Sequence, residues 1–215
     1  MSLFDLLDES VQQEPRSRRI YGMVVGIVTN NRDPDGLGRV KVKFPWLSDD
    51  DESAWARLVA PMAGPQHGVY FLPEVEDEVL VAFEHGDVNF PYVLGALWNG
   101  TDKPPVTNSD GKNNVRMIKS RSGHVVKFND EAGKETIEII DKNQKNTIVI
   151  DASQGTITVT ADKDITLSAS NGTIKLDAQK VQINSSAAMQ LKAGSTMNLE
   201  ASGTMTVKGS TVNIN

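Results

Sequence analysis

The sequence predicts an all-β protein with two parts, a small N-terminal barrel and a C-terminal needle built from very short strands. Three observations support this prediction. Within residues 20–98, short apolar runs alternate with polar residues and are separated by turn residues. From Ile148 onward, pairs of apolar residues recur with a mean period of eight residues. After Phe128 there is no Phe, Tyr or Trp, so the second part lacks the large side chains that usually fill a core.

The barrel is expected to span residues 20–105. Its expected strand residues are Val24, Ile27 and Val28; Val40, Val42 and Phe44; Val79, Val81 and Phe83; and residues 92–97. Turn sequences such as DPDG at 33–36 and EHGD at 84–87 separate these runs. About five short strands with such turns fit a Greek-key barrel of the OB type. Eleven of the twelve aromatic residues precede residue 99, which predicts that the aromatic core belongs to this domain.

The repeat is expected to form a β-helix over residues 137–215, after a linker and neck at 106–136. In each repeat unit one residue separates two apolar residues, so both apolar side chains point to the same face of a strand. Ile137 and Ile139 form an irregular first pair. The residues predicted to form the core of the needle are Ile148, Ile150, Ile157, Val159, Ile165, Leu167, Ile174, Leu176, Val181, Ile183, Met189, Leu191, Met197, Leu199, Met205, Val207, Val212 and Ile214.

A single ribbon of such strands has open edges and cannot exclude water from its apolar side. One way to close it is a monomeric β-helix of about three coils, in which three repeat units of one chain form the walls. The other is an intertwined homotrimer, in which three identical chains wind around a common axis and form the walls of a triangular prism. The regular period favours the trimer, because its walls are equivalent by symmetry.

Composition and charge restrict the classes of function. The first 112 residues carry 10 basic and 18 acidic side chains, a balance that would repel nucleic-acid phosphates. The chain has no Cys, so it can form neither a disulfide framework nor a thiolate metal site. The N-terminal segment has no basic start followed by an apolar run, and no stretch is apolar enough for a transmembrane helix. We therefore expect synthesis and assembly in the cytoplasm.

The polar residues considered for a catalytic or binding site are scattered along the sequence. His67, His85 and His124 are isolated in the sequence, without a metal-binding spacing or a nucleophile motif. The acidic run at 49–52 could hold a cation, but it lacks the regular ligand intervals of a calcium loop, and a solvated loop is the favoured interpretation. We expect no catalytic residue, no metal site and no cofactor.

A nucleic-acid interface is the alternative function for the barrel. Arg39, Lys41 and Lys43 alternate along one expected strand, and OB barrels often bind nucleic acids through such a face. The sequence shows no stacking aromatic residues on this face, and the domain is acidic. We therefore expect no nucleic-acid partner.

Several motifs of the chain resemble one known family. They are GLGRVKVKFPWL at 36–47, WARLVAPMAG at 55–64, FLPEVEDEVLVAFEHGD at 71–87 and PYVLGALWNGTDKPP at 91–105. In this order they resemble the OB-fold domain of VgrG and phage baseplate protein V spikes. RSGHVVKFNDEAGKETIEIID at 121–141 is similar to the neck that leads those proteins into their β-helix. Glu76 departs from the pattern, because the family usually has Gly there, and we interpret it as a tolerated turn variant.

The resemblance implies a mechanical function without enzyme activity. It implies the central spike of a contractile injection system: a phage tail baseplate, a type VI secretion-like system or an extracellular contractile particle. Such a spike pierces the target cell envelope when the sheath contracts, so it acts within the particle and contacts the target membrane transiently. An OB-fold nucleic-acid-binding protein with a trimerising tail stays open as a second class of function, and a fibre or adhesin, with or without a hydrolase, as a third.

The resemblance also implies two partners besides the two other copies of the chain. VgrG chains carry a hub domain before the barrel, whereas about 19 residues precede it here, so we expect a separate hub protein. The residues expected to dock on it, in a short helix at 1–19, are Leu3, Phe4, Leu6 and Leu7. A disordered tail is the alternative.

At the other end of the needle, we expect a PAAR-like tip protein. The residues expected to bind it are Val212, Asn213, Ile214 and Asn215. Fraying of the last strand is the alternative. Some relatives hold iron at the apex through a His-x-His motif, but no His follows His124, so this metal site is not expected.

Overall fold

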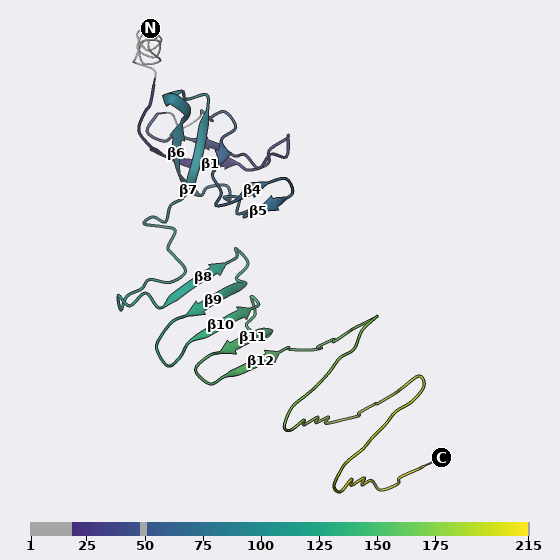
Figure 1. Cartoon of the computed structure of the whole chain (residues 1–215). Helices are drawn as coiled ribbons and strands as arrows, with labels where there is room; N and C mark the ends of the chain where they lie inside the picture. The colour runs from purple at the N-terminus through teal and green to yellow at the C-terminus, as the bar shows by residue number, and fades with distance from the viewer. Residues whose placement is uncertain (1–18, 48–50, 215) are drawn as a thin grey trace, which may run out of the picture. The chain divides into compact units, whose positions relative to one another are not determined.

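The computed structural model describes residues 19–47 and 51–214 (Figure 1). These residues form an all-β structure with one short 3-10 turn, η2 (Glu84–Gly86). The chain divides into two units, Met1–Thr160 and Ala161–Asn215. Two five-stranded sheets and a small hairpin account for the regular structure of the first unit.

The first sheet has the strand order β2-β1-β6-β7-β3. Its strands are β1 (Val24–Asn30), β2 (Lys41–Lys43), β3 (Arg57–Leu58), β6 (Glu78–Phe83) and β7 (Pro91–Ala96). All neighbours are antiparallel except β3 and β7, which are parallel. Between β3 and β6 the chain forms a hairpin of β4 (Ala63–Gly64) and β5 (His67–Gly68). The expected strand residues thus lie in or beside β1, β2, β6 and β7, whereas β3, β4 and β5 were not predicted.

Valine side chains fill most of the core of this sheet. The buried residues are Val28, Val40, Val42, Phe44, Ala56, Val79, Val81, Phe83 and Val93. Alternate residues of β6 are buried, as the period-two pattern predicts. The expectation of an aromatic core is met only by Phe44 and Phe83, whose ring centroids are 5.7 Å apart. Trp46 and Trp98 are more than half exposed, so in the single chain these large rings do not form the core.

A polar cluster holds the loop between β1 and β2. The Asp33 carboxylate, 3% exposed, accepts hydrogen bonds from the backbone N–H groups of Asp35, Leu37 and Arg39. It also accepts two from the Arg39 guanidinium, at 2.7 and 2.9 Å. Gly36 takes a φ of 66°, which favours glycine. The hydrogen bond from Arg39, followed by those from the backbone, holds the pKa of Asp33 well below its ordinary value.

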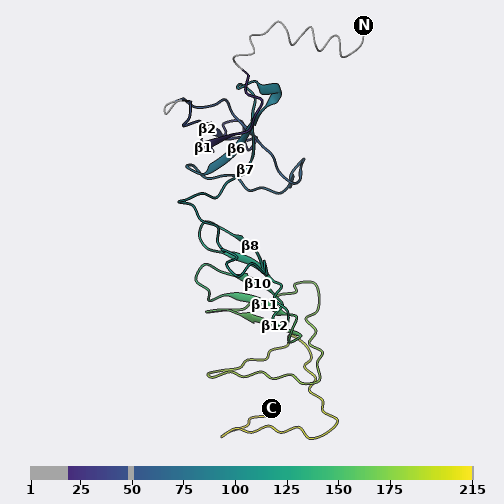
Figure 2. The same cartoon turned by 90° about the vertical axis from the view of Figure 1, so that its left-hand side faces the viewer.

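The second sheet is an antiparallel meander in which each strand pairs with the next. Its strands are β8 (Val115–Lys119), β9 (Val125–Asn129), β10 (Thr136–Ile140), β11 (Thr147–Asp151) and β12 (Thr156–Thr160). Tight turns join these five-residue strands, and Gly123, Gly133, Gln144 and Gly155 have a positive φ there. The meander is therefore built from local contacts within one chain (Figures 1 and 2).

Residues 161–214, which the structure describes, contain no strand. The backbone hydrogen bond recorded among them joins the N–H of Gly172 to the carbonyl of Ala169 at 3.3 Å. Every residue of this segment except Ala161 is exposed, so its backbone groups find almost no partner within the chain. Across the described parts of the protein, no helix has the length and apolar character needed to cross a membrane.

Candidate assembly surfaces

One face of the meander, which we call the neck face, is apolar apart from Arg116 on the edge strand β8, which pairs with Phe128. Its residues are Ile118, Val126, Phe128, Ile137, Ile139, Ile148, Ile150, Ile157 and Val159, and each is at least 36% exposed. The strand register places them side by side, because Ile139 pairs with Val126 and Ile148 in the neighbouring strands. Ile118, Val126 and Phe128 were not predicted. Val126 and Phe128 flank Lys127 in the same way as the pairs of the repeat, whereas Ile118 follows Arg116 at two residues and has no such pattern.

The neck face is more exposed than the more polar face of the same sheet. Residues of the opposite face, such as Glu138, Ile140 and Val149, are only partly exposed. An antiparallel sheet with one solvated face normally turns its polar side to water. Here the apolar side is the open one, and a contiguous exposed apolar surface marks an interaction site.

An ion pair stabilises the register on the opposite face. Lys127 and Glu138 are directly paired on β9 and β10, and Lys127 Nζ lies 2.9 Å from Glu138 Oε2. The Thr136 hydroxyl donates a second hydrogen bond to Glu138 at 2.7 Å. Partial burial alone would raise the pKa of Glu138, but the hydrogen bonds from Lys127 and Thr136 outweigh it and lower the pKa.

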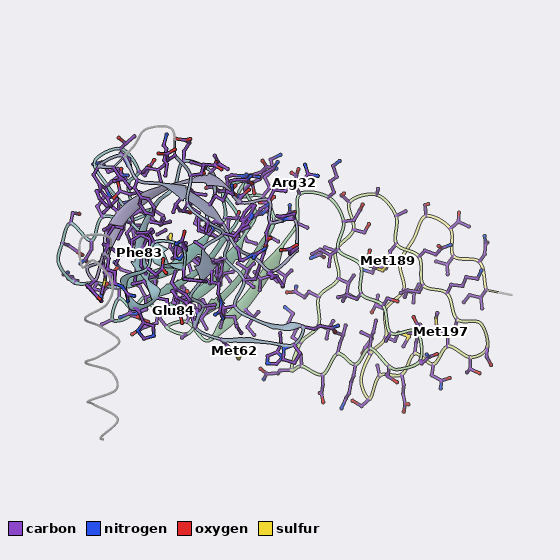
Figure 3. All side chains as sticks on the ribbon, turned by 90° about the horizontal axis from the view of Figure 1, so that it is seen from above. Arg32, Met62, Phe83, Glu84, Met189 and Met197 are labelled. Carbon is purple, nitrogen blue, oxygen red and sulfur yellow. The ribbon has the colours of Figure 1, made fainter. Side chains whose placement is uncertain are left out.

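The predicted needle residues fall into both units. Ile148, Ile150, Ile157 and Val159 belong to the neck face, and those from Ile165 to Ile214 lie in the second unit. All are exposed within the single chain, by 46% or more in the second unit. Figure 3 shows the side chains along this open ribbon, with Met189 and Met197 labelled. Buried contacts for these residues would have to come from outside the chain.

The residues expected to bind partners are only partly described. Val212, Asn213 and Ile214 are exposed. Asn215 and the expected hub-docking residues Leu3, Phe4, Leu6 and Leu7 lie outside the described residues.

Two of the three basic residues considered for nucleic-acid binding are engaged in ion pairs. Arg39 binds Asp33 and Asp35, and Lys41 Nζ lies 3.0 Å from Glu52 Oε2. The hydrogen bond from Lys41, the larger contribution, lowers the pKa of Glu52. These contacts neutralise most of the positive charge on that strand.

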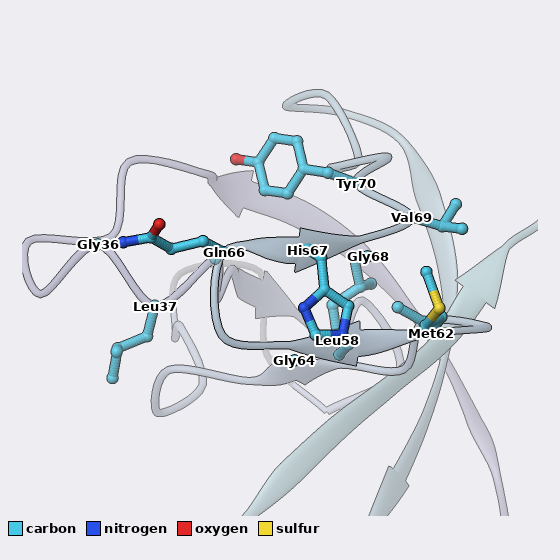
Figure 4. Close-up of a pocket in the computed structure, with 13 residues that line it drawn as sticks. Gly36, Leu37, Leu58, Met62, Gly64, Gln66, His67, Gly68, Val69 and Tyr70 are labelled. Carbon is cyan, nitrogen blue, oxygen red and sulfur yellow. The ribbon is translucent and has the colours of Figure 1, made fainter.

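The three histidines lie apart from one another. His67 belongs to β5, His85 lies in η2, and His124 lies in the turn before β9, where its Nδ1 accepts a hydrogen bond from the Lys142 N–H at 3.3 Å. His67 lines an open depression of about 570 Å³ beside the β4–β5 hairpin, together with Leu37, Met62 and Tyr70 (Figure 4). Among the described residues, no three His, Asp or Glu side chains are placed to hold a metal ion.

Comparisons with known proteins place the first sheet in a family. Residues 24–98 match the type VI secretion system/phage-baseplate injector OB domain. The chain is 35% identical over 111 residues to the type VI secretion system spike protein VgrG3 of Vibrio cholerae. The matched region is 48% of this chain and 11% of that protein. It is also 30% identical over 131 residues to the type VI secretion system spike protein VgrG1a of Pseudomonas aeruginosa. That match covers 55% of this chain and 20% of the relative.

A further relative is the actin cross-linking toxin VgrG1 of Vibrio cholerae, 34% identical over 111 residues. The matched part is 10% of that protein. The chain thus corresponds to between a tenth and a fifth of the length of these relatives. The matched residues include three of the four barrel motifs on which the sequence resemblance rests, and the first part of the fourth, residues 91–98. Residues 24–98 therefore match the injector OB domain, and over about half of its length the chain is similar to VgrG spike proteins.

Proposed function

We propose that this chain is the structural central spike of a contractile injection system and that it acts as a homotrimer. The single observation that carries the proposal is the neck face, an apolar sheet surface that the chain leaves open to water. Covering it with two other copies would remove a large apolar area from water, which is the main source of stability in such assemblies.

The second unit supports the same proposal. Residues 161–214 carry the eight-residue repeat but make almost no backbone hydrogen bonds of their own. Backbone groups of folded proteins are nearly always paired. Three chains that wind around one axis would pair these groups and enclose the apolar pairs, and would produce a stiff needle.

The mechanical role follows from this stiffness. A trimeric β-helix resists bending because every strand is hydrogen-bonded to strands of the other chains. Contraction of a sheath would drive it through the target envelope, with the OB domain at its base. In this proposal the partners are a baseplate hub and a tip protein, as the family resemblance implies.

The solution mass tests the proposal. Three chains of 23.4 kDa would form a particle of about 70 kDa. Light scattering should find this mass, and the particle should resist mild denaturant because unfolding one chain exposes the other two. A monomer at micromolar concentration would refute the spike, and salt-dependent binding of oligonucleotides would favour the nucleic-acid alternative.

A further inference from the structure

The last part of the repeat carries an unusual pattern of charge. Residues 181–214 contain three charged side chains, Lys192, Glu200 and Lys208, which are spaced eight residues apart and alternate in sign. Each directly follows the second apolar residue of a pair, so all three occupy the same position in the repeat. All are exposed, and within the described structure none forms an ion pair.

The spacing has a geometric meaning in the trimer, on which this inference rests. Eight extended residues span about 26 Å, enough for one wall of the prism and its corner. Each chain therefore passes to the next wall with every repeat unit. The strands stacked on one wall are about 4.8 Å apart and come from the three copies in turn. Each strand belongs to the repeat unit that follows, in the sequence, the unit of the strand before it. Lys192 of one copy then lies beside Glu200 of a second, which lies beside Lys208 of the third.

We propose that these three residues form a ladder of ion pairs between copies that sets the register of the needle. If one chain slips by one repeat unit, identical units become neighbours on a wall. Lys192 then lies beside Lys192 and Glu200 beside Glu200. Opposite charges on neighbouring strands attract and like charges repel, so the slip converts stabilising contacts into destabilising ones.

Between the units at residues 189–191 and 197–199, the apolar core cannot make this distinction. Met189 and Leu191 are followed eight residues later by Met197 and Leu199, so a slip of one unit replaces the same side chains with themselves. The residue between the two apolar residues of each of these pairs points outward and is uncharged, as Gln190 is. Its contacts therefore change little when the register shifts. Weakly specified strands are prone to slippage, and the charged positions supply the missing specificity.

The meander shows the same device within one chain. Lys127 and Glu138 are paired across β9 and β10, on the face opposite the apolar residues, with 2.9 Å between their charged atoms. The ladder would repeat this arrangement between copies, with its charges likewise on the side away from the core.

Cross-linking of the full chain tests the register directly. The chain has no native Cys, so N198C introduces the single thiol. In the correct register the three thiols lie on different walls at the same height and cannot meet. After a slip of one unit two of them become neighbours about 4.8 Å apart, within the Cα distance that a disulfide requires. Dimers on a non-reducing gel after mild oxidation with copper phenanthroline therefore report slippage.

The expected results use two charge variants. E200K in the N198C background places three lysines along each wall, and the cross-linked fraction should rise at least about tenfold over N198C alone. The triple variant K192E/E200K/K208E restores alternating signs and should return the fraction to that of N198C. If E200K prevents assembly altogether, recovery of the trimer in the triple variant supports the ladder equally.

A matched control separates charge position from charge amount. Q190K/T206K adds the same net charge as E200K, but it places the two lysines of each chain in repeat units that are not adjacent, and it should leave the cross-linked fraction low. The ladder is refuted if E200K behaves like this control, or if the triple variant is as defective as E200K. A parent N198C protein that is monomeric by light scattering would instead refute the trimer itself.

Discussion

Replacing Ile139 with threonine should dissociate the trimer while leaving the single chain folded. Ile139 lies at the centre of the neck face, beside Val126 and Ile148 on the neighbouring strands. Threonine is β-branched and favours strands, so β10 should keep its backbone conformation. In the single chain the side chain is 49% exposed, and a hydroxyl there can reach water.

The expected loss of trimer stability is large because each of the three chains carries the substitution. Complete burial of isoleucine contributes roughly 1.5–3 kcal/mol, so burying the 49% that is still exposed contributes about 1 kcal/mol per chain. Enclosing an unpaired hydroxyl costs roughly 1–3 kcal/mol more. The lower values give about 2 kcal/mol per chain and about 6 kcal/mol per trimer, which corresponds to about four orders of magnitude in the dissociation constant.

Sedimentation velocity over a dilution series, with and without guanidinium, measures this change. Val149→Thr is the matched control, since Val149 lies on the opposite face of β11 and should not contact another copy. Circular dichroism checks that both variants retain their strands. A dissociation constant for Ile139→Thr within threefold of the parent value, or equal losses in both variants, would refute the assignment of the neck face.

Two further predictions concern the OB domain. The lowered pKa of Asp33 means that its ionised form stabilises the fold above the unfolded pKa of about 3.9 and that this contribution is lost as the pH falls below it. Asp33→Asn should therefore lower the melting temperature at pH 7, and the melting temperature of the variant should fall less between pH 5 and pH 2 than that of the parent. Parallel plots of melting temperature against pH for the two proteins would contradict this. Val81→Ala, at a fully buried position, should cost about 2–3 kcal/mol in urea unfolding followed by tryptophan fluorescence. A cost below about 0.5 kcal/mol would mean that the core repacks around the missing methyl groups.

The sequence predicted the elements whose side chains alternate strongly. Val79, Val81 and Phe83 form the buried side of β6, and the residues that alternate with them are Glu78, Leu80 and Ala82. The motifs at 36–47 and 71–87 identified the OB domain, and their order along the chain made the resemblance specific. Glu76 takes a φ of 76° in the turn before β6, which explains why glycine suits this position.

Other features could not be predicted because they depend on pairing across the chain. β3 has two residues and exists through its parallel contact with β7, which no local pattern reveals. Aromatic content indicated the domain but not its core, since the packing of β1, β2 and β6 leaves room mainly for valines. The neck face went unrecognised in β8 and β9 because Ile118, Val126 and Phe128 precede the regular repeat.

The change in pairing after Thr160 has a consequence for how the protein reaches its final state. The meander closes through hairpins of neighbouring residues, and such local structure forms within microseconds without another molecule. Residues 161–214 have almost no hydrogen-bond partners in their own chain, so their ordering must wait for collisions. The rate of that step should rise with protein concentration, whereas the rate of hairpin formation should not. Chains emerging close together from one messenger would therefore mature faster than the same chains diluted through a cell.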